Sequence, residues 1–233
     1  MKVLKNVLIT GGTRGIGKSI VKELSKKYNV HYTGKKKKNI KNYYQLDLSD
    51  QVSVNNFIKI VSNLKIDILI NNAGINNIKY FSSYKNSEIY DVLNVNLTNL
   101  IIITKSILKN MIKNKWGRIV NISSVWGVNP CKKRSIYAIT KSGLISFSKS
   151  LAIEYGRFNI TTNCISPGFI LTDLTKKSLT ADQLKFLKKK IPLQRFGSPK
   201  EIAEIVSLLC QKKNYINGTN IIVDGGFLSG YEI

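Results

Sequence analysis

Short apolar runs alternate with longer amphipathic segments along the 233-residue chain. Apolar runs of about four to six residues are typical of strands, and those dominated by Ile, Leu and Val indicate strands covered on both faces. The runs predict strands at 7–10, 30–33, 43–46, 66–70, 118–122, 161–165 and 220–223.

The intervening segments have apolar positions at helical spacing, as in the face formed by Ile16, Ile20 and Leu24. Ser198 followed by Pro199 is a typical helix start. The connection 34–42 is short and carries four consecutive lysines, so we do not expect a helix there. Helices are predicted at 15–27, 52–64, 87–95, 97–113, 137–155 and 199–210.

Alternating strands and helices favour a parallel sheet with helices on both faces. The length suits one α/β domain, and neither an internal repeat nor a linker rich in Pro, Gly and Ser interrupts the pattern. We therefore expect an α/β fold in which residues 1–233 form a single Rossmann-type, doubly wound parallel sheet flanked by helices.

The chain carries 37 basic and 13 acidic residues, a net charge of +24. Such a charge favours nucleic acid, a membrane surface or an acidic protein as partner. A genome biased towards adenine and thymine, which enriches Lys, Asn and Ile, is the simpler explanation, because the lysines are spread over most predicted helices. We expect no nucleic-acid partner. A local cluster of basic residues could still have a function of its own.

No apolar stretch reaches the length of a membrane span, and the apolar N-terminal run is too short for a signal peptide. The three cysteines are odd in number and lack metal-ligand spacing, which indicates free thiols in a reducing compartment. We expect no metal site and no membrane association. The expected location is the cytoplasm, or the plastid stroma if the protein is organellar.

A glycine-rich turn, Thr10–Gly17, lies where the first strand must pass into the first helix. Gly11 allows a tight turn, Gly15 lets the backbone approach a pyrophosphate, and Gly17 permits close helix–strand packing. A purely structural turn is the alternative, but the position between a strand and an amphipathic helix favours a dinucleotide site.

The residues after the second strand contain no acid before Asp47, whereas NAD sites usually place a carboxylate there. Arg14 lies inside the glycine turn, and a 2′-phosphate requires cations. The pattern therefore predicts NADP (NADPH), with Asp47 accepting from the adenine amino group. Lys35–Lys38 either contributes to the phosphate site or forms a solvated loop.

The segment Asn71–Gly74 follows the fourth predicted strand. Its small residues would let a bound ribose pass close to the chain, and its amides could hold the edge of the sheet. On these residues alone, an ordinary Asn-rich turn is the better explanation of the segment.

Tyr137 and Lys141 are one helical turn apart and therefore face the same way. A free tyrosine titrates near pH 10, and we expect the Lys141 ammonium to lower the pKa of Tyr137 towards neutrality. Ser124 ends a strand, where its hydroxyl would hydrogen-bond the substrate oxygen, and Ser123 should point the opposite way.

Over nearly its whole length the chain resembles the short-chain dehydrogenase/reductase family. That resemblance implies a catalytic tetrad of Asn96, Ser124, Tyr137 and Lys141, in which Lys141 also binds the nicotinamide ribose and Asn96 holds a water that relays protons. It further implies a homotetramer built through two long helices. The residues that carry it are Thr10–Gly17, Asp47, Asn71–Gly74, Asn96, Ser124, Tyr137, Lys141 and Pro167–Thr172. The cofactor contacts expected are Gly11, Thr13, Arg14, Gly15, Ile16, Gly17, Asp47, Leu48, Asn72, Ala73, Gly74, Tyr137, Lys141, Pro167, Gly168, Ile170 and Thr172.

Within that family the chain is most similar to the 3-oxoacyl-acyl-carrier-protein reductases, notably over 142–152, 165–174, 191–201 and 216–226. The resemblance implies NADPH-dependent reduction of a 3-oxoacyl thioester in fatty acid biosynthesis. Sister enzymes share every catalytic residue, so an oxidoreductase of a small or sugar-derived carbonyl compound is the alternative. A nucleotide sensor or nucleic-acid scaffold is a third hypothesis, and the intact tetrad argues against it.

The resemblance also implies docking of an acidic acyl carrier protein, with Arg118 at a basic position that those reductases use. A second docking arginine matches imperfectly, since Arg157 lies beside the expected place, which holds Phe158. The loop before Tyr137 carries Lys132, Lys133 and Arg134. This loop either favours an anionic substrate or carrier, or is simply solvated.

Overall fold

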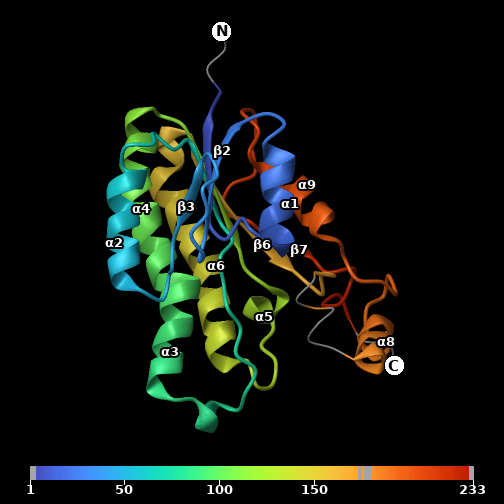
Figure 1. The fold of residues 1–233 in the computed structure, drawn as a ribbon. Coiled ribbons are helices and arrows are strands. Elements are labelled where there is room, and N and C mark those ends of the chain that lie inside the picture. The colour runs from blue at the N-terminus through green and yellow to red at the C-terminus, as the bar shows by residue number, and fades with distance from the viewer. Residues whose placement is uncertain (1–3, 173–174, 176–179, 231–233) are drawn as a thin grey trace.

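The computed structural model describes residues 4–172, 175 and 180–230. Within them, one sheet of seven parallel strands has the order β3-β2-β1-β4-β5-β6-β7 (Figure 1). The predicted doubly wound sheet is confirmed. The strands are β1 (Asn6–Ile9), β2 (Asn29–Gly34), β3 (Tyr43–Gln45), β4 (Ile68–Asn71), β5 (Gly117–Ile122), β6 (Ile160–Pro167) and β7 (Asn220–Val223).

Helices cover both faces of the sheet (Figure 1). One face carries α1 (Gly15–Leu24) and α9 (Pro199–Leu209), which pack on each other, and the other carries α2 (Gln51–Val61), α4 (Asn99–Lys113) and α6 (Ser135–Tyr155). A further helix, α3 (Asn86–Leu93), precedes α4. No helix in the described part of the chain is long and apolar enough to cross a membrane.

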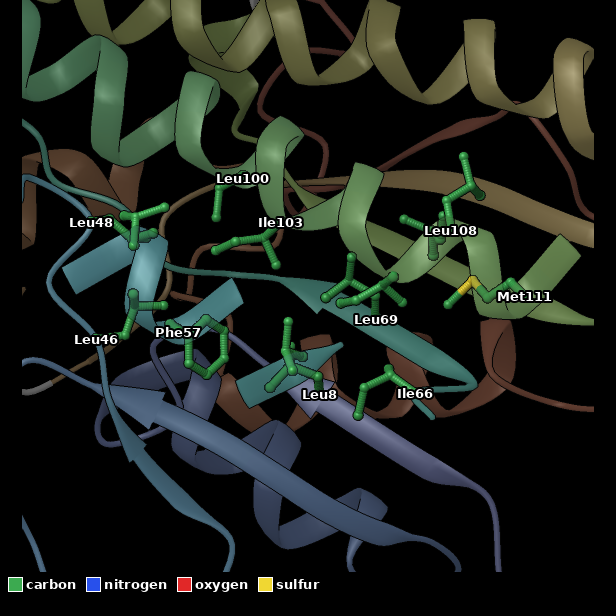
Figure 2. Packing of buried hydrophobic residues seen from close by; sticks show 14 of the residues in the cluster. Leu8, Leu46, Leu48, Phe57, Ile66, Leu69, Leu100, Ile103, Leu108 and Met111 are labelled. Atoms are coloured by element: carbon green, nitrogen blue, oxygen red, sulfur yellow. The ribbon is translucent and has the colours of Figure 1, made fainter. Parts of the chain in front are cut away.

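Neighbouring residues of a central strand are buried in opposite layers. Leu8 and Leu69 pack with Phe57 and Ile103 under α2 and α4 (Figure 2), whereas Ile9 belongs to the cluster under α1 and α9. All five side chains are at most 1% exposed. Burial on both faces explains why the strand sequences are continuously apolar rather than alternating.

The strand order reverses at β1, which pairs with β2 on one side and β4 on the other. In an open parallel sheet such a reversal leaves a crevice at the carboxyl ends of the strands, where ligands bind. The segments that follow β1, β4, β5 and β6 all start at this edge.

Several short elements were not predicted from the sequence. They are the 3₁₀ turns η1 (Phe81–Ser83) and η3 (Gly156–Phe158), α5 (Val125–Val128) and α8 (Ala181–Lys189). In α8 no residue is buried, and this nine-residue helix carries three lysines among its apolar residues. A single π-helical turn, η2 (Asn94–Thr98), joins α3 to α4 where the sequence predicted a break.

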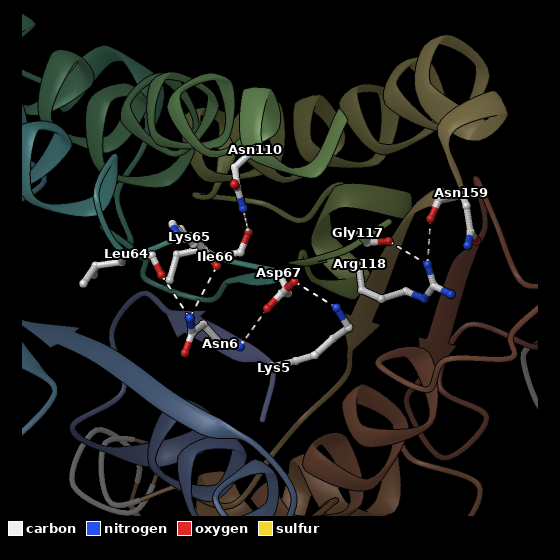
Figure 3. A network of polar contacts seen from close by, with 10 residues as sticks. All are labelled: Lys5, Asn6, Leu64, Lys65, Ile66, Asp67, Asn110, Gly117, Arg118 and Asn159. Atoms are coloured by element: carbon white, nitrogen blue, oxygen red, sulfur yellow. Dashed lines mark hydrogen bonds and ion pairs between the residues drawn. The ribbon is translucent and has the colours of Figure 1, made fainter. Parts of the chain in front are cut away.

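Arg118, at the start of β5, is the bulkiest fully buried side chain, with 1% of its surface exposed. Its guanidinium donates to the carbonyls of Gly117 (2.7 Å) and Asn159 (2.9 Å) (Figure 3). It also donates to the carbonyls of Gln211 (3.1 Å) and Lys212 (2.7 Å) just beyond α9. Carbonyls at a helix C-terminus carry partial negative charge, which favours a cation there. Arg118 therefore ties β5 to the end of α9.

The expectation that Arg118 docks a carrier protein is wrong. The side chain is buried and its donors are directed at backbone carbonyls. It also lies at the amino edge of the sheet, six residues and about 20 Å of strand away from Ser124. Arg157, the imperfect match, is exposed on η3 at the same edge.

Replacing Arg118 should destabilise the fold. We expect Arg118→Met to lower the free energy of unfolding by about 3 kcal/mol, because the buried carbonyls lose their donors. Arg157→Met, at an exposed site, should change it by less than about 0.5 kcal/mol. Urea unfolding followed by circular dichroism measures both, and equal stability of the two variants would contradict the role of the network.

Candidate active site

The glycine turn is joined to the end of β4 by polar contacts from two residues. The Thr10 hydroxyl accepts from the backbone N–H groups of Asn72 (3.0 Å) and Ala73 (3.1 Å). The Asn72 amide donates to the carbonyls of Thr10 and Gly11, each at 3.0 Å. The amide of Asn72 therefore holds the turn in place, which is the structural role that the sequence allowed for these amides.

Three glycines of the turn, Gly11, Gly12 and Gly17, have no room for a side chain. Gly11 has φ 68°, and a Cβ there would lie 3.0 Å from Ala73 Cα. A Cβ on Gly17 would lie 2.1 Å from the Gly11 carbonyl oxygen. The turn thus brings bare backbone to the crevice between β1 and β4, as close approach of a pyrophosphate requires.

The N-terminus of α1 faces this crevice without a partner from its own sequence. Arg14 precedes the helix, no side chain caps it, and no acid occupies the first turn. Such an end attracts anions through its N–H groups and dipole. A hollow of about 260 Å³ lined in part by Gly15, Lys18 and Thr172 adjoins it. These features fit a dinucleotide pyrophosphate, and Ile16 and Thr13 flank the same turn.

Arg14 and Lys35 flank one region of the surface. A Cβ on Gly34 would lie 2.5 Å from Thr13 Cγ2, so the end of β2 touches the glycine turn. Arg14 follows Thr13, Lys35 follows Gly34, and both are exposed. Arg14 and Lys35 therefore lie on two segments that touch, and the Lys35 ammonium pairs with Asp47.

Asp47 follows β3 and its carboxylate is already engaged. Oδ2 pairs with Lys35 Nζ at 2.8 Å, and Oδ1 accepts from the backbone and hydroxyl of Ser49. Partial burial acts to raise the pKa of Asp47, but the contacts with Lys35 and Ser49 outweigh it and lower the pKa. Leu48 is buried, with its carbonyl accepting from Asn99.

Asn96 lies in the π-helical turn and is completely buried. Its Oδ1 accepts from the N–H of Ile75 and its Nδ2 donates to the Ile75 carbonyl, both at 2.8 Å. A Cβ built on Gly74 would lie 3.4 Å from Asn96 Oδ1 and 3.5 Å from Lys141 Nζ. Asn96 and Lys141 therefore border the same small residue after β4.

Lys141 extends from α6 to the end of β5 and is 3% exposed. Its Nζ donates to the Ile122 carbonyl at 2.8 Å and lies 5.6 Å from the centre of the Tyr137 ring. Burial lowers the pKa of Lys141 to about 8. An ammonium with few polar partners is thus held beside the tyrosine.

Tyr137 and Ser124 lie close enough for the serine hydroxyl to act on the phenol. Burial raises the pKa of Tyr137, while the Ser124 hydroxyl and the charge of Arg134 oppose the rise. The expected lowering by Lys141 is therefore wrong for this arrangement, because desolvation of the phenol dominates. Ser123 points the other way as predicted, donating to the Lys141 carbonyl at 2.8 Å.

The segment after β6 closes the crevice from the side. Gly168 packs against Asp224, where a Cβ would lie 2.7 Å from the Asp224 Cβ, and Thr172 lies over Gly15. Ile170 is buried and bridges to Gly197. Thr172 thus lies beside the glycine turn, and Pro167, Gly168 and Ile170 belong to the chain that leads to it. In sequence, segment 165–174 is among those most similar to the 3-oxoacyl-acyl-carrier-protein reductases. Its residues 173 and 174 lie outside the described part of the chain.

An aromatic cluster, which sequence reasoning missed, lies next to Ser124. Trp126 packs edge-on against Phe169 (5.9 Å between ring centres) and Phe227 (5.6 Å), and Phe169 also contacts Phe196. Trp126 donates its backbone N–H to the Ser124 hydroxyl. The rings come from four separate segments, so only the position of Trp126 two residues after Ser124 could have indicated the cluster.

Comparison with known proteins agrees with this geometry. A family model of short chain dehydrogenases matches residues 5–183. The chain is 41% identical over 224 residues to the 3-oxoacyl-[acyl-carrier-protein] reductase of Aquifex aeolicus, covering 94% of this chain and 86% of that protein. It is 40% identical to the corresponding reductase of Buchnera aphidicola from Schizaphis graminum, covering 95% and 96%.

Two solved structures share the fold and about a third of the sequence. ElxO with NADP bound is 31% identical with a TM-score of 0.89, over 98% of this chain and 100% of that one. The 4-hydroxyisoleucine dehydrogenase complexed with NADH is 30% identical with a TM-score of 0.90, over 97% and 100%. The glycine turn, the Ser–Tyr–Lys arrangement and these matches together place the chain in the short-chain dehydrogenase family.

Proposed function

We propose that this protein is an NADPH-dependent reductase that converts the 3-oxoacyl thioester of an acyl carrier protein to the 3-hydroxyacyl form, as in fatty acid biosynthesis. The observation that carries the proposal is the meeting of Ser124, Tyr137 and Lys141 at the sheet edge that also holds the glycine turn. The similarity to reductases of this name supports the substrate.

The turn Thr10–Gly17 and the start of α1 would hold the pyrophosphate, and Arg14 with Lys35 the 2′-phosphate. Gly74 and Lys141 would border the nicotinamide ribose, and Pro167–Thr172 the nicotinamide itself. When bound, the reduced cofactor supplies a hydride to the substrate carbonyl carbon. The protein must then supply a proton to the carbonyl oxygen and hold that oxygen beside the proton donor.

Tyr137 is the proton donor in this proposal. Its raised pKa keeps the phenol protonated at neutral pH, as an acid must be before the step. The Ser124 hydroxyl donates to the substrate oxygen and holds it beside the phenol. As the carbonyl oxygen takes the proton, the phenolate left on Tyr137 is stabilised by the Lys141 ammonium. Asn96 fixes the chain at Ile75 and so keeps this side of the cleft in place.

Reduction of a small or sugar-derived carbonyl compound is the alternative function. The specific observation in its favour is the structural relative that is a 4-hydroxyisoleucine dehydrogenase, at 30% identity. Spectrophotometric NADPH oxidation with an acetoacetyl thioester, run beside a panel of small ketones and sugars, separates the two. Turnover of the panel without turnover of the thioester would favour the alternative.

We further propose a homotetramer in the cytoplasm, or in the plastid stroma if the protein is organellar. The long helix α6 leaves Ile139 56% and Ile153 85% exposed, which is apolar surface suited to contact with a second copy. Sedimentation equilibrium tests the assembly.

Removing the phenol hydroxyl should stop the reaction and leave cofactor binding intact. We expect Tyr137→Phe to lower kcat by about 10³-fold, because general acid catalysis is lost. The dissociation constant for NADPH, from fluorescence titration, should change less than about threefold. Tyr155→Phe, at the far end of the same helix, is the control. Substantial turnover by Tyr137→Phe would refute the assigned proton donor.

The cofactor preference should depend on Arg14 and Lys35. The wild-type enzyme should have a higher kcat/KM with NADPH than with NADH. Arg14→Ala should lower kcat/KM for NADPH by about tenfold or more while leaving NADH unchanged, because a charge-assisted phosphate contact is lost. Lys41→Ala, in the exposed loop before β3, is the control. Equal use of both cofactors by the wild type would contradict this assignment.

The buried ammonium of Lys141 should cost stability. We expect Lys141→Met to abolish turnover and yet raise the free energy of unfolding at pH 7 by about 1 to 3 kcal/mol. Since the pKa of Lys141 in the folded protein is about 8, below the ordinary lysine value of 10.5, the penalty is full below pH 8 and fades as the pH rises towards 10.5. Urea unfolding should show that Lys141→Met is more stable than the wild type at pH 7 and that the difference in the free energy of unfolding is smaller at pH 9.5. A variant less stable than the wild type at pH 7 would contradict the prediction.

A further inference from the structure

Two loops that are far apart in the sequence lie together beside the candidate active site. One follows β4 and includes residues 77–84, and the other joins α5 to α6. The Lys79 N–H donates to the Lys133 carbonyl at 3.1 Å, which joins them. In Figure 1 both loops lie at the end of the molecule opposite the N-terminus.

Both loops are anchored in the catalytic region. The first starts from Ile75, whose backbone is bound by Asn96. The second ends at Arg134, immediately before α6 and three residues before Tyr137, and its guanidinium lies 5.9 Å from the Trp126 ring. A molecule held by these loops is therefore held next to the proton donor.

The loops gather cations around aromatic rings. Lys132 and Lys133 have their Nζ atoms 5.6 and 4.8 Å from the centre of the Tyr80 ring. Lys79 Nζ lies 5.3 Å from the Tyr84 ring, and the Tyr84 hydroxyl donates to the Asn77 carbonyl. These contacts hold the lysines close together in spite of their mutual repulsion.

The charge of this surface is not neutralised. Within the described residues, Glu88 is the one carboxylate paired with these cations, and both its oxygens accept from Lys79. Apolar surface lies between the charges, because Ile78 is 60%, Tyr80 49% and Phe81 64% exposed. We call Ile78–Phe81 together with Lys132–Arg134 the rim.

We propose that the rim docks the acidic face of the carrier protein that delivers the 3-oxoacyl thioester; this rests on the proposed function. Aromatic side chains and arginine are enriched at protein interfaces. An acidic partner complements the charge of Lys132 and Lys133, which pair with no carboxylate among the described residues. A small anion would need converging donors in a pocket, whereas these side chains are spread over an open surface. The rim also takes the place of Arg118, which is buried.

The test compares two double charge reversals on three substrates. The rim variant is Lys132→Glu with Lys133→Glu, both at exposed positions. The control is Lys59→Glu with Lys65→Glu, near the amino edge of the sheet and with the same charge change. Lys65 has φ 46° and Lys133 has φ 66°, so each variant places one glutamate in left-handed backbone. The substrates are the acetoacetyl thioesters of N-acetylcysteamine, of 4′-phosphopantetheine and of the carrier protein.

We expect the rim variant to raise KM for the carrier-linked thioester about tenfold at low ionic strength, and the control less than twofold. The other two thioesters should change less than twofold with either variant. Rising ionic strength should raise KM of the wild-type enzyme only for the carrier-linked thioester. An equal loss with the 4′-phosphopantetheine thioester would assign the rim to the phosphate of the arm and overturn protein docking. Three further results would overturn protein docking. They are an equal rise in KM in the control variant, a rise in KM for all three substrates in the rim variant, and an unchanged KM for the carrier-linked thioester in the rim variant.

A binding measurement keeps this result separate from the proposed function. Fluorescence anisotropy with labelled carrier protein needs no turnover. If the wild type reduces no thioester, the proposed function fails, and the rim is then judged by whether its variant alone loses binding. Equal binding by the wild type and the rim variant overturns the docking surface whatever the activity.

Discussion

The close approach of the glycine turn to the end of β4 is the constraint on which the site depends. Gly11 and Gly17 leave no room for a side chain, and the Thr10 hydroxyl holds two successive N–H groups of the neighbouring segment. This contact sets the width of the crevice at the point where the strand order reverses. A larger residue at either glycine would push the first helix away from β4, and with it the backbone that fits a pyrophosphate.

The opposite side of the crevice is built from buried polar groups rather than from loops at the surface. Asn96 is completely buried and Lys141 nearly so, and each is satisfied by a backbone carbonyl or N–H group. Buried polar groups of this kind rigidify a site when their partners are present. Lys141 differs because it brings a charge into a region of low polarity, and this lowers its pKa to about 8. The buried charge of Lys141 beside Tyr137 therefore lowers the stability of the folded protein.

The position of each charge matters more than the net charge of +24. Arg118 carries a full charge and yet offers nothing to a partner, because carbonyls of β5, the turn before β6 and the end of α9 surround it. Lys132 and Lys133, in contrast, lie over an exposed tyrosine and pair with no carboxylate among the described residues. Basic residues of one chain thus serve either the fold or the surface, depending on what packs around them.

The sequence by itself determined the doubly wound sheet, the position of each of its seven strands and the residues of the nucleotide turn. These follow from local pattern, since strand burial and glycine placement are written in neighbouring residues. It also placed Tyr137 and Lys141 on one helix face, a matter of spacing alone. Only the tertiary structure decided the burial of Arg118, the raised pKa of Tyr137, the cluster around Trp126 and the meeting of Lys79 with Lys133. Each depends on segments that come from distant parts of the chain, and desolvation and long-range contact leave no periodic signal in a sequence.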